Sequence, residues 1–165
     1  MGTDKGNSSN GGESGFTLVE LLIVIGIITI LFAVILVAVD PARRFGEARN
    51  AARFAESSSI LSAILQYQVD NRGNLPSGID SLPGSGQVLG TNTTGCNLTC
   101  TATRTETACL DMSGSLVEAY LSAIPIDPGS GTSGNTDYFM DKTAGGRLVV
   151  GACDPEVGVT VQVKR

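Results

Sequence analysis

The sequence contains no histidine and no tryptophan among its 165 residues. The absence of histidine excludes histidine-dependent catalytic triads and most catalytic zinc sites. No nucleophile is paired with a base, and the glycine-rich stretches lack the lysine and the strand-to-helix setting of a phosphate loop. A net charge of −5 does not indicate wholesale binding to nucleic acid. The composition therefore favours a structural or binding protein over an enzyme.

One long apolar run dominates the N-terminal part of the chain. Residues 16–39 form a stretch of about 24 residues in which Glu20 is the only charged side chain. As an α-helix, a stretch of this length crosses a hydrocarbon core of roughly 30 Å. A carboxylate within such a span is costly in lipid and therefore marks a functional site. The polar residues before the run end in Gly15, whereas the cleavage site of a secretory signal follows its apolar region. A cut before the run would leave the apolar helix with the mature protein.

The residues at the start of this run carry a family resemblance. Residues 15–22, GFTLVELL, resemble the prepilin signature of type IV pilins and type II secretion pseudopilins. In that family a membrane peptidase cuts after the glycine and methylates the new N-terminal residue. The resemblance extends to residue 68, and residues 120–128 also resemble segments of pilin and major pseudopilin heads. It implies cleavage between Gly15 and Phe16, N-methylation of Phe16, and assembly roles for Glu20, Thr17 and Gly26.

The charges around the span conflict with the direction of insertion that the resemblance implies. Residues 1–15 are predicted to be a disordered leader that is removed, and they contain a single lysine. A basic collar lies after the span, formed by Arg43, Arg44, Arg49 and Arg53. The positive-inside rule would place the C-terminal part of the chain in the cytoplasm. We follow the resemblance, because the cysteines and polar composition suit an exported head. The collar is expected to meet anionic lipid headgroups before assembly and acidic residues of neighbouring subunits afterwards, or simply to be solvated.

Residues 40–73 are predicted to form an amphipathic helical stem after a kink or break at Pro41. Apolar residues recur at steps of three and four, the spacing of one helix face: Phe45, Ala48, Ala52, Ala55, Ile60, Leu61, Ile64 and Leu65. The stripe from Ile60 onward is expected to pack against the head, and Gly73 is a plausible stop. The arginine-rich first half is too polar for a core. It is either a solvated stalk or a helix buried among copies of itself, and the resemblance favours the second interpretation.

Residues 74–165 are predicted to form the globular head. Residues 74–107 are rich in turn-forming residues and are interpreted as a loop, and a short helix is expected near residues 116–121. Strands are predicted at residues 138–140, 147–152 and 157–163, with a hairpin turn at residues 144–146. The predicted fold class is α+β. A long N-terminal helix spans the membrane with its first half and packs its second half on a small antiparallel sheet, as in the pilin fold.

All four cysteines, Cys96, Cys100, Cys109 and Cys153, lie in the head. An even number in an exported domain indicates two disulfides, for which three pairings exist. A zinc site of four thiolates is the alternative, but the spacing lacks paired C-x-x-C knuckles. We predict Cys96–Cys100 as a local loop and Cys109–Cys153 as a long-range bond.

Three acidic residues of the head, Asp127, Asp137 and Asp141, flank one loop and are candidates for a calcium site. Some of the major pseudopilins that the chain resembles bind calcium in the head. The spacing matches no EF-hand, so ordinary surface acids are the alternative. No other cofactor is expected.

These observations predict a non-enzymatic structural subunit that polymerises into a type IV pilus for adhesion, motility or DNA uptake. The expected partners are further copies of the chain, a prepilin peptidase, the pilus assembly platform and the inner or cytoplasmic membrane. The subunit would be a single-pass membrane protein before assembly, then part of an extracellular pilus or periplasmic pseudopilus. Two alternatives stay open: a secretion or competence pseudopilin in a short filament, and a membrane-anchored binding module that does not polymerise.

Overall fold

The computed structural model describes residues 15–165. The predicted leader, apart from Gly15, lies outside the described residues. The chain divides after Pro41 into two compact units, which are described separately because their relative placement is not determined.

The first unit contains α1, Leu18–Val39, which agrees with the predicted span. It is the one helix among residues 15–165 that is long and apolar enough to cross a membrane. Its 22 residues extend roughly 33 Å at 1.5 Å per residue. Many of its residues are β-branched, but in lipid the backbone must satisfy its own hydrogen bonds, which favours the helix. The helix ends at Asp40, whose φ of 44° is left-handed.

The second unit contains all of α2, Pro41–Asp70, except its first residue. Pro41 is its first residue, so the predicted break at this proline is confirmed. At the other end Arg72 adopts a φ of 59°, and the N–H of Gly73 donates to the carbonyl of Gln68 at 2.7 Å. This six-residue bond is the Schellman ending of a helix and confirms the predicted stop.

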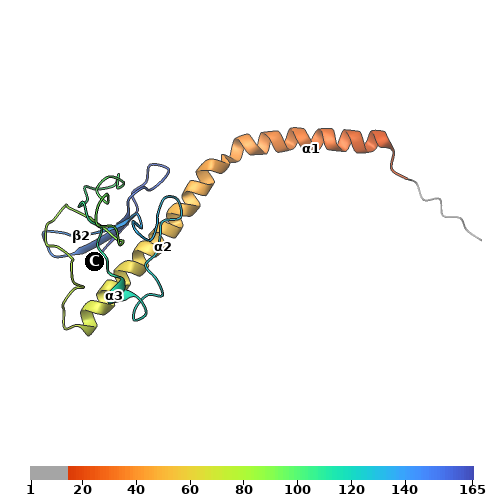
Figure 1. Cartoon of the computed structure of the whole chain (residues 1–165). Helices are drawn as coiled ribbons and strands as arrows, with labels where there is room; N and C mark the ends of the chain where they lie inside the picture. Colours follow the sequence, from red (N-terminus) through yellow and green to blue (C-terminus); the bar gives the residue numbers. More distant parts are fainter. Residues whose placement is uncertain (1–14) are drawn as a thin grey trace, which may run out of the picture. The chain divides into compact units, whose positions relative to one another are not determined.

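The head contains a four-stranded antiparallel sheet in the order β1-β2-β3-β4. Its strands are β1 Gln87–Val88, β2 Tyr138–Lys142, β3 Leu148–Ala152 and β4 Gln162–Lys164. The β2–β3 hairpin turns where predicted, with the N–H of Thr143 donating to the carbonyl of Arg147 at 2.8 Å. The sheet and α2 together confirm the α+β class, and α2 runs beside the sheet in Figure 1.

Three predictions about local structure in the head were wrong. Residues 74–107 are not entirely loop, because they contain β1, which pairs with the edge of β2. Strand β4 starts at Gln162 and not at residue 157, since Val157 and Gly158 adopt left-handed φ angles of 58° and 67°. The short helix α3 covers only Ser113–Leu116 and is followed by Glu118 at a φ of 71°.

The core lies between the second half of α2 and the sheet. Ile60, Leu61 and Ile64 are buried there against Met140 and Val150, as the periodicity predicted for this half. The side chain of Tyr138 is also buried, and its hydroxyl donates a hydrogen bond to the Glu56 carboxylate. This bond satisfies the polar end of an otherwise apolar side chain.

In the first half of α2 the apolar residues do not pack inside the chain, but a different row of residues does. Phe45, Ala48, Ala52 and Ala55 are exposed. The residues that are buried instead form a row at helical spacing: Gly46, Asn50, Arg53 and Ser57. A Cβ built on Gly46 would lie 2.7 Å from Cγ2 of Val157, so a larger residue there would force the Val157 side chain to move.

The structure contains two disulfides, Cys96–Cys109 and Cys100–Cys153. The predicted pairing of Cys96 with Cys100 and of Cys109 with Cys153 was therefore wrong. Backbone bonds explain the difference, because the N–H of Cys96 donates to Thr107 at 3.1 Å and the carbonyl of Cys153 accepts from Ala102 at 2.9 Å. Each cysteine of the 96–100 loop is thus held beside a partner from a distant segment.

We expect peptide mapping without reduction to recover these two bonds and no free thiol. In the chain-entropy model, the 53-residue separation of Cys100–Cys153 gives about 4 kcal/mol of stabilisation and the 13-residue separation of Cys96–Cys109 about 3 kcal/mol. The Cys100→Ser/Cys153→Ser variant should therefore unfold at lower denaturant concentration than Cys96→Ser/Cys109→Ser. Recovery of a Cys96–Cys100 peptide would contradict the structure.

Candidate processing and assembly site

The residues of the predicted processing site lie immediately before α1 and are accessible. Gly15 and Phe16 are exposed, and a Cβ built on Gly15 would meet no atom within 4 Å. The fold itself therefore does not require glycine at this position. A requirement for glycine has to come from outside the chain, as a peptidase that accepts only a small residue would impose.

Thr17 and Glu20 form a capping box at the start of α1. The Thr17 hydroxyl oxygen accepts from the backbone N–H of Glu20 at 3.2 Å. In return, Oε2 of Glu20 accepts from the backbone N–H of Thr17 at 3.1 Å and from its hydroxyl at 3.0 Å. This arrangement satisfies donors that an uncapped helix leaves free. The carboxylate also lies at the positive end of the helix dipole.

Because of the capping box, Glu20 is not an isolated charge in the apolar span. Both donors of Thr17 direct the carboxylate back toward the N-terminal end of α1, the end at which cleavage after Gly15 would create an amine. The signal for this role was present in the sequence, since Thr followed three residues later by Glu is the capping-box pattern.

Gly26 lies within α1 and is exposed like the rest of the helix. A Cβ at this position would meet no atom within 4 Å, and the carbonyl of Gly26 accepts from the Thr29 hydroxyl at 2.9 Å. Packing inside the described chain therefore does not explain the glycine.

A second polar cluster, which the sequence reasoning missed, joins α2 to the head. The Arg53 guanidinium is bidentate to Asp127, with Nε–Oδ2 at 2.5 Å and Nη2–Oδ1 at 2.9 Å. Its Nη1 donates to Glu156 at 2.9 Å, and Arg49 binds the same carboxylate at 2.5 and 2.6 Å. Asn50 adds two bonds to the Glu156 backbone, at 2.7 and 3.0 Å.

This cluster is a buried ion network. The side chain of Arg53 is 2% exposed and that of Asp127 is 0% exposed. Hydrogen bonds from Arg49 and Arg53 lower the pKa of Glu156 to about 2. Burial tends to raise the pKa of Asp127, but Arg53 and the N–H groups of Gly129 and Ser130 outweigh it, so the net shift is downward. The Asp127 partner in turn raises the pKa of Arg53.

The basic collar therefore divides into two parts. Arg49 and Arg53 pair within the head, which corrects the expectation that all four arginines face lipid, neighbours or solvent. Arg43 and Arg44 are exposed and pair with Glu47 at 3.1 and 3.0 Å. The polar row at positions 46, 50, 53 and 57 was the signal that could have revealed the difference.

The structure does not gather the three calcium candidates into a site. Both Asp127 oxygens bind Arg53, and Asp141 accepts from the N–H of Gly84. Asp137 is 3% exposed, its Oδ1 has no hydrogen-bond partner, and burial raises its pKa. Within residues 15–165 no group of three or more His, Cys, Asp or Glu side chains is placed to hold a metal.

Acid should destabilise the head through this network. The pKa of Glu156 is about 2 in the folded chain against an ordinary 4.5, so the unfolded chain takes up the proton first. The stabilisation is complete above about pH 4.5 and is lost as the pH falls toward 2. We expect the unfolding temperature to fall over this window and Glu156→Gln to flatten the fall, with the exposed Glu47→Gln as the control. An unchanged pH profile in Glu156→Gln would contradict this assignment.

These features together define a class of protein: an apolar anchor helix that opens with a capped carboxylate, and a disulfide-bonded α+β head. This combination is consistent with the pilin fold. Residues 11–36 match the family model of the prokaryotic N-terminal methylation motif, the signature of type IV pilins and pseudopilins. This match supports a type IV pilin- or pseudopilin-like protein, and the length and composition of α1 fit a single-pass membrane anchor. No curated protein and no solved structure matches it.

Proposed function

We propose that the chain is cut between Gly15 and Phe16, methylated at Phe16, and polymerised into a type IV pilus on the cell surface. The observation that carries the proposal is α1: it begins three residues after Gly15, and none of its 22 residues is buried within the chain. An apolar helix without internal partners is stable in lipid or among copies of itself. Polymerisation transfers α1 from the lipid into a bundle with the α1 helices of other copies.

The exposed face of α2 supports packing among copies. Phe45 and Phe54 are 65% and 52% exposed on this helix. Ala48, Ala51, Ala52 and Ala55 are exposed beside them and would let a second helix approach closely. In the proposed filament, the α1 helices and the first halves of the α2 helices pack together, while the heads form the outer surface.

Glu20 is proposed to guide docking. Cleavage creates a positive amine at Phe16, four residues before the carboxylate. In a staggered bundle, Glu20 of an incoming subunit reaches the amine of its neighbour and exchanges its Thr17 bonds for an ion pair. Gly26 allows close helix contact. The proposed partners are the prepilin peptidase, which recognises the exposed Gly15, and the assembly platform, which extracts the subunit from the membrane.

Electron microscopy of material sheared from cells tests this function. Wild-type cells should carry long filaments that contain the chain, and deletion of its gene should remove them. A short filament, with loss of protein secretion on deletion, would identify a pseudopilin instead. A subunit that stays monomeric in the membrane, with normal secretion on deletion, would indicate an anchored binding module and would contradict the proposal.

A further inference from the structure

The head contains a pocket of about 480 Å³, here called the polar pocket, that no step of the proposed function uses. It is lined by residues from the 92–99 segment, from the loop before β2 and from the turn after β3. Asp137 and Asp154 contribute carboxylates, and none of the described residues in its lining is cationic. The side chains with hydroxyl or carboxamide groups are Asn92, Thr94, Thr99, Ser130, Thr132 and Asn135.

Asp137 has a carboxylate that the fold does not use. The residue is 3% exposed, and its Oδ1 has no hydrogen-bond partner within residues 15–165. Its backbone is paired, because its N–H donates to Oδ1 of Asn135 at 3.1 Å and its carbonyl accepts from the N–H of Cys153 at 2.8 Å. Asparagine adopts the left-handed φ of 57° as readily as aspartate and would bury no charge. A role for the carboxylate therefore has to come from outside the chain.

The surroundings of Asp137 are negative. Burial raises the pKa of Asp137, and the charges of Asp154 and Asp127 add to the shift. Asp127 is compensated by Arg53. Neither Asp137 nor Asp154 has a cationic partner among the ion pairs of the described residues. A bound cation would supply the missing positive charge.

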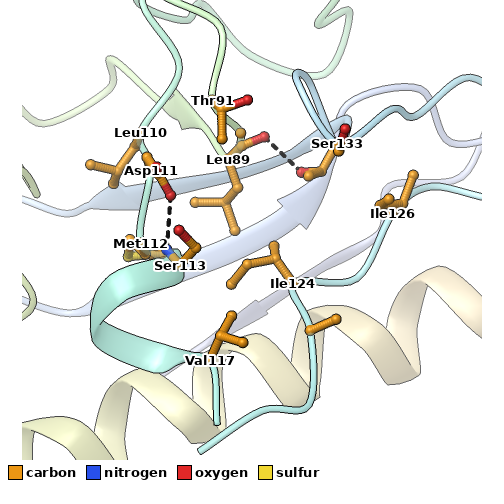
Figure 2. A pocket seen from close by; sticks show the side chains of 13 residues that line it. Leu89, Thr91, Leu110, Asp111, Met112, Ser113, Val117, Ile124, Ile126 and Ser133 are labelled. Atoms are coloured by element: carbon orange, nitrogen blue, oxygen red, sulfur yellow. Dashed lines mark hydrogen bonds between the residues drawn. The ribbon is translucent and has the colours of Figure 1, made fainter.

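The apolar pocket shown in Figure 2 lacks such a demand. It has a volume of about 260 Å³, and Leu89, Leu110 and Met112 in its lining are buried. Its one carboxylate, that of Asp111, accepts from the N–H of Ser113 at 2.9 Å (Figure 2). The unpaired buried charge thus directs the search for a ligand to the polar pocket.

The chemistry of the polar pocket favours an organic cation over a metal ion. Calcium takes six to eight oxygen ligands, whereas no group of three or more acidic, Cys or His side chains within residues 15–165 is placed to hold a metal. The volume of the pocket lies in the range of small-molecule sites, about 300–1,000 Å³. An ammonium group donates to carboxylates, and hydroxyl and carboxamide groups both donate to and accept from ligand hydroxyls.

We propose that the polar pocket binds a small polyhydroxylated primary amine, of the amino-sugar class. The ammonium group pairs with the carboxylates of Asp137 and Asp154. The hydroxyl and carboxamide side chains around them bind the hydroxyl groups of the ligand. This site lies wholly within the head, and its occupation does not depend on polymerisation.

Calorimetric titration of the full chain in detergent tests the site with glucosamine, in near-neutral buffer that keeps most of the amine protonated. Glucose is the matched neutral probe, since it has a hydroxyl in place of the amine. Glucosamine should bind saturably, and glucose at least about tenfold more weakly because it lacks the charge-assisted bond. Absence of saturable glucosamine binding, or equal binding of the two sugars, would overturn the proposal. Saturable binding of calcium that glucosamine does not displace would also overturn it, because the site would then be a metal site.

Asp137→Asn separates binding from a structural role. The variant keeps the size of the side chain, so the unfolding temperature should stay the same or rise while glucosamine affinity falls at least about tenfold. Asp141→Asn is the control and should bind normally, since Asp141 does not line the pocket. Asp154→Asn changes a half-buried residue and should also weaken binding, which keeps the test open if Asp137→Asn does not fold. Wild-type affinity in both pocket variants, or in the one that folds, would overturn the proposal.

Discussion

Replacing Glu20 with alanine should remove filaments from the cell surface while the processed subunit remains folded and abundant in the membrane. The carboxylate is the only charge in the apolar run, and its hydrogen bonds within residues 15–165 go to Thr17. Its loss therefore leaves the core between α2 and the sheet unchanged. The substitution instead removes the proposed partner of a neighbour's Phe16 amine.

The expected size of the effect depends on the environment of the carboxylate. Insertion scales put an acidic side chain at mid-span at about 2.5–3.5 kcal/mol. If docking relieves only 1.4 kcal/mol of this insertion cost, the docked state is favoured by an additional factor of about ten. Because each added subunit repeats the step, we expect a loss of at least tenfold in sheared filament.

Two control variants separate the charge from the cap. Thr17→Val removes the hydroxyl of the capping box but keeps the carboxylate, so it should reduce assembly less than Glu20→Ala. Glu47→Ala removes an exposed carboxylate that pairs only with Arg43 and Arg44 among the described ion pairs, and should assemble normally. Normal filament yield from Glu20→Ala as the sole subunit would show that the proposed role is wrong.

Replacing Arg53 with methionine should destabilise the head by about 3–5 kcal/mol. The substitution leaves Asp127 buried without a cation, and removing one partner of a buried pair costs this much because the other charge stays uncompensated. Denaturant unfolding of the processed chain in detergent, followed by the near-ultraviolet signal of its tyrosines, measures the change.

The same unfolding experiment separates the contribution of the Arg53–Asp127 ion pair from that of the packing around it. Arg53→Met combined with Asp127→Leu should recover part of the loss, because an apolar pair leaves no buried charge. Arg43→Ala, which breaks an exposed pair, should change stability by less than about 1 kcal/mol. Equal stability of Arg53→Met and wild type would mean that the network does not hold α2 to the head.

The N-terminal part of the chain could be predicted because its signals are local. The apolar run, the glycine before it and the Thr17–Glu20 spacing all fall within a few turns of one helix. In the second half of α2 the periodicity of Ile60, Leu61 and Ile64 also sufficed, since an apolar stripe at helical spacing faces a core.

The remainder depends on contacts that join distant positions. Arg53 meets Asp127 across 74 positions and Glu156 across 103, and no periodicity connects them. The disulfide pairing is likewise set by the packing of loops, so four cysteines alone left three possibilities. Strand β1 has only two residues and forms because β2 offers it an edge. Tertiary context decided each of these features.

The most direct test of cleavage, methylation and polymerisation is the intact mass of the subunit recovered from sheared filaments. We expect a chain that begins at Phe16, carries one added methyl group and contains two disulfides. Replacing Gly15 with a bulky residue should leave the uncut chain in the membrane, although that position has room for a side chain in the fold. A filament subunit that still begins at Met1 would contradict the proposed processing.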